Sequence, residues 1–185
     1  MSRLTLAMRW RRRQPLAAIV LCSLLAGIAG NANAVEQQIF GWVERVEIID
    51  GRFTFKAKLD SGAATSSLDA SDIETFRRDG KKWVRFTITN PHDGEPVTLE
   101  RRHQRTVRII RHSGKHQRRQ VVSINVCLGK RLFDIEVSLI DRGEFIYPLL
   151  LGRSALEKFA LIDPGETFLS KPRCDYPLDA DEEKD

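Results

Sequence analysis

The sequence predicts an all-β protein, built as an antiparallel barrel or sandwich. Five runs alternate apolar and polar residues with period two, a pattern typical of strands. Turn signals such as Asp-Gly and Ser-Gly separate these runs at intervals of about ten residues, which favours many short antiparallel strands. The runs span residues 40–49, 53–59, 83–89, 121–128 and 132–140.

The first 34 residues resemble a secretory signal peptide. Arginines up to Arg13 precede an uncharged apolar run over residues 16–30, and Ala32-Asn33-Ala34 has the small-x-small form of a cleavage site. The run is shorter than the roughly 20 residues that a membrane-spanning helix needs. We therefore expect cleavage after Ala34, a periplasmic or secreted mature protein, and no stable membrane span after cleavage.

The net charge of +5 arises from this same segment. It contains five arginines and no acidic residue, so the rest of the chain has 25 basic and 25 acidic residues. The high overall pI therefore does not indicate a basic protein seeking nucleic acid.

The turns and the helix can be placed along the remaining chain. Asp50-Gly51 predicts a two-residue hairpin turn, and Asp79-Gly80 is one of the later breaks between strands. After Gly152, the spacing of Ser154 and Glu157 predicts a capped helix in which Leu156 and Phe159 share an apolar face.

The C-terminal residues 173–185 are acidic and poor in apolar side chains, so we expect a disordered tail. Cys127 and Cys174 are the cysteines beyond the predicted leader. In an oxidising compartment they could form a disulfide, or they could remain a buried thiol and an exposed one.

The segment over residues 55–68, FKAKLDSGAATSSL, is the first candidate site. Here an alternating strand ends in Asp60-Ser61-Gly62-Ala63. A glycine lets another backbone approach closely, and a carboxylate at a strand end is available for chemistry. By itself the tripeptide is common in turns, where the aspartate accepts local backbone N–H groups. The second candidate is the apolar strand Leu149-Leu150-Leu151, which ends in Gly152 and Arg153.

Together these elements resemble a retropepsin-like aspartic peptidase, in which an Asp-Ser/Thr-Gly-Ala loop meets a later strand ending in glycine. More narrowly, the chain is similar to the bacterial branch labelled ATP-dependent zinc protease. The likeness extends from Phe40 to Leu169. It rests on residues 56–63, 66–70, 83–86, 105–119, 128–129, 140–142, 147–153 and 161–163.

The resemblance implies a closed retropepsin-like barrel over residues 35–172 with one short C-terminal helix. It implies that Asp60, Ser61 and Gly62 are catalytic, and that Ala63, Gly152 and Arg153 support them. Retroviral members carry an aspartate where this chain has Ala64, and that aspartate pairs with the arginine corresponding to Arg153. The partner of Arg153 is therefore open.

The metal and nucleotide that this label suggests are not expected. The sequence has neither His-Glu-x-x-His nor a Gly-rich loop ending in Gly-Lys-Ser/Thr. His112 and His116 are four residues apart, but Ser113-Gly114 between them predicts a turn, so they would not share a helix face. We expect no metal and no cofactor.

The number of catalytic aspartates predicts a homodimer. Aspartic peptidases activate water between two carboxylates that share one proton. This sequence has one Asp-Ser-Gly element, and we interpret Asp163-Pro164-Gly165 as structural because proline replaces the hydroxyl residue. The second carboxylate should come from Asp60 of another copy across a twofold axis, with Ser61 bracing the two loops.

A hairpin over residues 105–122 is the candidate lid. Residues 101–119 include eight Lys or Arg, three His and no Asp or Glu. One interpretation is a solvated hairpin whose charges protect a strand edge. The other is a lid that selects acidic peptides or anionic polymers. Nucleic acid is not expected, because aromatic residues are not interleaved with the charges. The proposed lid residues are Arg105, Arg108, Arg111, Ser113 and Gly114.

The sequence thus predicts an aspartic endopeptidase acting on peptides or proteins, with acidic substrates as one option. The alternative is a catalytically silent retropepsin-like module that grips an anionic partner with residues 101–119. Replacement of Asp60 would separate the two hypotheses.

Overall fold

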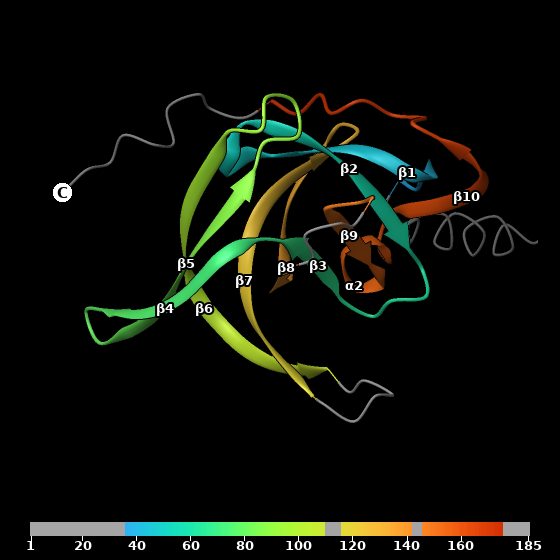
Figure 1. Cartoon of the computed structure of the whole chain (residues 1–185). Helices are drawn as coiled ribbons and strands as arrows, with labels where there is room; N and C mark the ends of the chain where they lie inside the picture. Colours follow the sequence, from blue (N-terminus) through green and yellow to red (C-terminus); the bar gives the residue numbers. More distant parts are fainter. Residues whose placement is uncertain (1–35, 110–115, 142–145, 176–185) are drawn as a thin grey trace, which may run out of the picture. The chain divides into compact units, whose positions relative to one another are not determined.

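The computed structural model describes residues 36–109, 116–141 and 146–175 (Figure 1). The predicted signal peptide, residues 176–185 and the lid residues Arg111, Ser113 and Gly114 lie outside these ranges. The elements are β1 (Gln38–Ile48), η1 (Ile49–Gly51), β2 (Phe53–Asp60), β3 (Ser66–Asp69), β4 (Ser71–Arg78), β5 (Lys81–Thr89), β6 (Pro96–Ile109), β7 (Gln117–Leu128), β8 (Arg131–Ile140), β9 (Leu149–Gly152), α2 (Arg153–Leu156) and β10 (Ala160–Thr167).

Six strands close into a barrel. Neighbouring strands pair in the order β1, β2, β9, β3, β8 and β7, and β7 pairs back to β1 with Val46 opposite Leu128. Closure leaves these strands without a free edge on the ring. The pairs β2–β9 and β3–β8 are parallel, whereas β1–β2 and β7–β8 are antiparallel. The predicted all-β class and the closed retropepsin-like barrel are therefore confirmed.

Alternation along the strands fills the barrel. On β2, Phe53, Phe55, Ala57 and Leu59 are buried, while the residues between them are more exposed. On β7, every second residue from Val122 to Leu128 is buried, and Ser123 and Asn125 between them are more exposed. Each of the five predicted strands is present, because this apolar face has to be removed from water.

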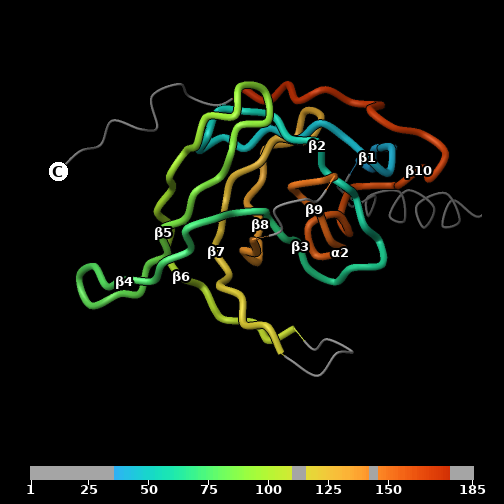
Figure 2. Tube along the Cα trace, in the orientation of Figure 1, coloured from blue at the N-terminus to red at the C-terminus, as the bar shows by residue number. Residues whose placement is uncertain are grey.

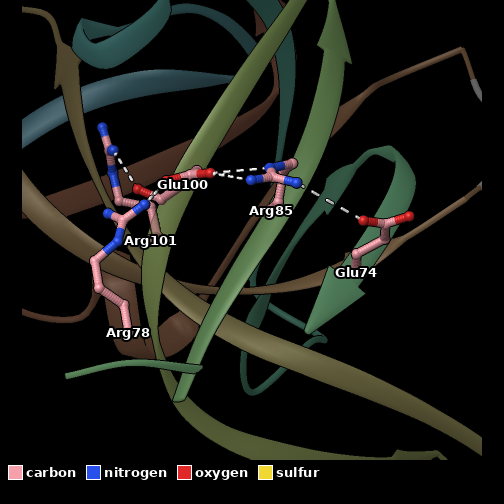
Figure 3. Close-up of polar contacts among 5 residues, drawn as sticks. All are labelled: Glu74, Arg78, Arg85, Glu100 and Arg101. Carbon is pink, nitrogen blue, oxygen red and sulfur yellow. Dashed lines mark hydrogen bonds and ion pairs between the residues drawn. The ribbon is translucent and has the colours of Figure 1, made fainter. Parts of the chain in front are cut away.

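Beyond the barrel, β6, β5 and β4 continue the sheet (Figure 1). The predicted break at Asp79-Gly80 is the two-residue turn between β4 and β5, with positive φ at both residues (51° and 72°). An ion network covers this part of the sheet: Glu100 is bonded by Arg85 and Arg78, and Arg85 also faces Glu74 at 4.0 Å (Figure 3).

The Asp50-Gly51 turn differs from the prediction. Ile48 and Phe53 are paired, so four residues connect β1 to β2, and they form η1 followed by Arg52 at a φ of 53°. Gly51 is needed for space: a Cβ there would lie 2.5 Å from the Phe53 ring.

The predicted capping box is wrong. A helix is present but ends at Leu156, so Phe159 lies in the turn after it, and both side chains are buried. The N-cap is Gly152, without a side-chain cap, and Ser154 lies inside the single turn. The free N–H groups of Arg153 and Ser154 instead donate to the carbonyls of Ala63 and Ala64. The site loop, residues 61–65 between β2 and β3, therefore caps the helix through its carbonyls. No helix of the described residues has the length and apolar character to cross a membrane.

The chain after α2 is tied to the barrel. The strand β10 pairs in parallel with β1, and Figure 2 traces the segment that follows it. The buried Glu44 carboxylate accepts hydrogen bonds from the backbone of Gly41, Leu169 and Ser170 and from the Ser170 hydroxyl.

A disulfide joins Cys127 on β7 to Cys174, which settles the alternative left open by the sequence. The N–H of Arg173 also donates to the Gly129 carbonyl at 2.7 Å. Residues 173 and 174, which we expected to begin a disordered tail, are thus fixed to the barrel.

Candidate active site

Asp60 is the last residue of β2 and lies opposite Gly152, the last residue of β9. Because side chains alternate along a strand, Leu59 enters the core and Asp60 points away from it. The Asp60 side chain is 22% exposed. The Asp60 carboxylate therefore lies at the C-terminal end of β2, where it is accessible to solvent.

The loop after β2 holds one oxygen of this carboxylate. Asp60 Oδ1 accepts hydrogen bonds from the N–H of Gly62 at 2.9 Å and the N–H of Ala63 at 3.2 Å. The Ala63 N–H also approaches the Asp60 carbonyl at 3.2 Å. These bonds orient the carboxylate and leave Oδ2 as the oxygen that no loop N–H occupies.

Gly152 allows the loop to pass against β9. A Cβ at this position would lie 2.6 Å from the carbonyl carbon and oxygen of Thr65, which is closer than real contacts allow. The N–H of Gly152 donates to the hydroxyl of buried Ser66 at 3.1 Å. The glycine predicted to support the site is therefore required by backbone contact.

Arg153, the first residue of α2, binds the loop that follows Asp60. Its Nη1 donates to the carbonyls of Ser61 at 2.8 Å and Gly62 at 3.0 Å. The partner that the sequence left open is therefore the main chain of the site loop. A backbone carbonyl pair takes the place of the aspartate that Ala64 replaces.

Lys58 is a residue that the sequence analysis missed. Its Nζ lies 3.1 Å from Asp60 Oδ2. The alternation of side chains along a strand could have identified it, since residues 58 and 60 lie on the same face of β2. Partial burial alone would raise the pKa of Asp60. The hydrogen bond and charge of Lys58, together with the N–H groups of Gly62 and Ala63, outweigh burial and hold that pKa below its usual range.

The arms of the predicted lid hairpin pair as far as Ile109 opposite Gln117. Arg105 is bonded to Glu136 on β8 at 2.8 Å, so the cation expected to serve substrate is already paired. Arg108 is exposed and lies opposite Arg118. A hollow of about 240 Å³ connects this region with the site loop; its lining includes Arg105, Glu136, Thr65 and Ser154.

The remaining titratable groups do not assemble into a metal site. Within residues 36–109, 116–141 and 146–175, no group of three or more His, Cys, Asp or Glu side chains could hold a metal ion. Asp163 lies on β10, where its Oδ1 accepts the Gly165 N–H at 2.8 Å.

The closed barrel and the Asp60 loop define a protein of the retropepsin-like class. A sequence model of the family described as retropepsin-like aspartic endopeptidase RimB matches residues 39–173. The chain therefore belongs to the RimB-like family, and the predicted family resemblance is confirmed.

Curated relatives have a different name. Proteins named probable alpha-L-glutamate ligase are 40% identical over 117 residues in Desulfotalea psychrophila and 34% identical over 126 residues in Shewanella pealeana. These alignments cover 59% and 67% of this chain but 24% and 28% of the relatives, so the chain spans about a quarter of their length.

A solved structure shares the fold. The crystal structure of a Legionella pneumophila protein of unknown function superposes with a TM-score of 0.63 at 36% identity. The match covers 72% of this chain and 98% of that one.

Proposed function

We propose that the protein is an aspartic endopeptidase that hydrolyses peptide bonds as a homodimer. The observation that carries the proposal is the Asp60 carboxylate at the end of β2: two loop N–H groups fix its Oδ1, and its Oδ2 contacts only the exchangeable side chain of Lys58 among the contacts described above. Ser61 and Gly62 next to it are exposed, so a substrate or a second copy can approach. The retropepsin-like family membership supports a hydrolase.

In the proposed dimer, Asp60 of each subunit supplies half of a dyad that shares one proton. The ionised member takes a proton from water, and the resulting hydroxide attacks the peptide carbonyl carbon. The protonated member donates its proton to the carbonyl oxygen. Collapse of the tetrahedral intermediate breaks the C–N bond, and the amine leaves with a proton from the dyad.

We propose glutamate-rich peptides as the substrate class. The cations gathered over residues 101–119 would attract such a chain. The name of the curated relatives, alpha-L-glutamate ligase, also concerns glutamate. With the leader removed after Ala34, the enzyme would act in the periplasm or outside the cell; a mature N-terminus at Val35, read by mass spectrometry, tests this.

The second candidate is a catalytically silent module that binds an anionic partner. The contact of Lys58 with Asp60 Oδ2 favours this module, since a lysine there stabilises the ionised carboxylate and opposes a shared proton. Digestion of a peptide library across pH by the wild type and by Asp60→Asn separates the two. The peptidase loses every cleavage on substitution, whereas the binder shows none in either form.

A further inference from the structure

Lys58 occupies the oxygen that the proposed chemistry needs. Asp60 Oδ1 is held by the N–H groups of Gly62 and Ala63, so Oδ2 is the oxygen available to water and substrate. In the structure Lys58 Nζ lies 3.1 Å from Oδ2. Lys58 therefore pairs with the Asp60 oxygen that would exchange a proton with water or substrate.

This ion pair is easily exchanged. The Lys58 side chain is 41% exposed and Asp60 is 22% exposed. A solvated lysine–carboxylate pair contributes only about 1 kcal/mol or less, so a competing carboxylate can displace it. The four-carbon stem of lysine lets the ammonium swing to a new partner without moving β2.

Among the described residues, Lys58 is the cation that pairs with the Asp60 carboxylate, and the neighbouring elements offer no replacement. Of the elements beside β2, β9 has no charged residue, and α2 contributes Arg153, which bonds the Ser61 and Gly62 carbonyls. On β1, Arg45 lies opposite Lys56 with its guanidinium over the Phe168 ring, and Glu47 lies opposite Thr54. Displacement of Lys58 would therefore remove the counterion that Asp60 has in the structure.

The ion pair has a consequence for the dyad. In a twofold dimer each Asp60 would have its own Lys58, and two cations would favour two ionised carboxylates. A doubly ionised dyad has a base but no acid to protonate the peptide carbonyl. The lowered pKa of Asp60 agrees with this direction.

We propose that Lys58 is a specificity residue that an acidic side chain of the substrate draws away from Asp60, so that substrate binding itself unblocks the dyad. The substrate carboxylate becomes the new partner of Lys58, and the dyad takes up one proton from solvent. A neutral peptide offers no such partner and leaves the ion pair in place. This inference rests on the proposed peptidase function and adds a reason for acidic selectivity.

The test compares two peptides of one backbone, a glutamate-rich peptide and the same peptide with glutamine at each glutamate. Lys58→Met should lower kcat/KM for the acidic peptide at least 10-fold and raise it for the neutral peptide at least 5-fold. The acid limb of its pH profile should move to higher pH. Lys58→Arg should keep the acidic preference. Lys56→Met, on the same face of β2, is the matched control and should leave the ratio of the two kcat/KM values unchanged.

Equal losses on both peptides for Lys58→Met would overturn the inference and leave the peptidase assignment standing, because they would indicate a structural role. Unfolding is monitored by circular dichroism, and the gain on the neutral peptide cannot come from a damaged fold. If the wild type cleaves neither peptide, the peptidase assignment fails. Fluorescence anisotropy of the labelled acidic peptide then decides the Lys58 contact: at least 10-fold weaker binding to Lys58→Met supports it, and equal binding overturns it.

Discussion

Asp60 and Glu100 are two carboxylates with a lowered pKa in different surroundings. At Glu100, hydrogen bonds and charge from Arg85 and Arg78 lower the pKa, and both partners lie on the sheet surface beyond the barrel (Figure 3). At Asp60, one lysine and two loop N–H groups lower the pKa against partial burial. A lowered carboxyl pKa therefore does not identify a site; the fixed loop and the adjoining glycine contact do.

The difference is largest when each carboxylate is neutralised. Asp60→Asn keeps the shape but removes the base, so kcat/KM on a glutamate-rich peptide should fall by roughly 10⁴-fold or more. Glu100→Gln should leave kcat/KM within about twofold of the wild type, because its partners are outside the site. Activity assays with thermal melting as the fold control check both. An active Asp60→Asn protein would contradict the comparison.

Gly152 and Gly80 are glycines for different reasons: close backbone packing at Gly152 and a positive φ at Gly80. Gly152→Ala forces a Cβ against Thr65, so the site loop must move; we expect about 1–3 kcal/mol of lost stability and at least about 100-fold lower kcat/KM. Gly80 has a φ of 72° and open space around it. Gly80→Ala should cost about 1 kcal/mol and leave activity unchanged. Urea unfolding and peptide hydrolysis measure the pair, and equal activities would refute the assigned difference.

Two arginines extend the comparison. Arg153→Met removes the donor to the Ser61 and Gly62 carbonyls, so kcat/KM should fall roughly 10-fold through misplacement of the loop. Arg85→Met breaks the Glu100 network and should change stability by about 1 kcal/mol or less, without an effect on kcat. A loss of activity in Arg85→Met would show that the sheet beyond the barrel contributes to hydrolysis, and would contradict the assignment of activity to the Asp60 loop.

The smallest effect concerns acid stability. Because the pKa of Glu100 is lowered in the folded protein, its ion pairs stabilise the fold above the unfolded pKa, about 4, and this contribution is lost as pH falls through the folded pKa. The stability difference between wild type and Glu100→Gln, about 1 kcal/mol or less at pH 7, should shrink toward zero below pH 4. Urea unfolding at a series of pH values measures this stability difference. A difference that does not change with pH would show that the Glu100 charge does not contribute to it.

The sequence could predict those elements whose apolar pattern is local. The run over residues 121–128 alternates because one face is buried, and β7 forms there. The strand β4 was missed because none of its residues is fully buried, and its pairing with β5 supplies the stabilisation. The site pair Asp60 and Gly152 was predicted through a family resemblance, not through spacing.

Contacts across long sequence separations could not be predicted. The carbonyls that bind Arg153, and those that cap α2, come from a loop about ninety residues earlier, and no local pattern encodes which main-chain atoms will be free there. Lys58 lies within the matched residues 56–63 and shares a face of β2 with Asp60, but neither feature identifies it as the ion-pair partner of that carboxylate. The capping box failed because tertiary partners had already satisfied the helix N–H groups.

The most direct measurement of the central claim is a subunit-mixing experiment. Wild-type and Asp60→Asn chains are allowed to exchange at a fixed total concentration, and hydrolysis of the glutamate-rich peptide is followed as the wild-type fraction varies. If each active unit needs two Asp60 side chains, activity follows the square of that fraction, and about a quarter remains in an equal mixture. A linear dependence, with about half remaining, would mean that one chain suffices and would contradict the account.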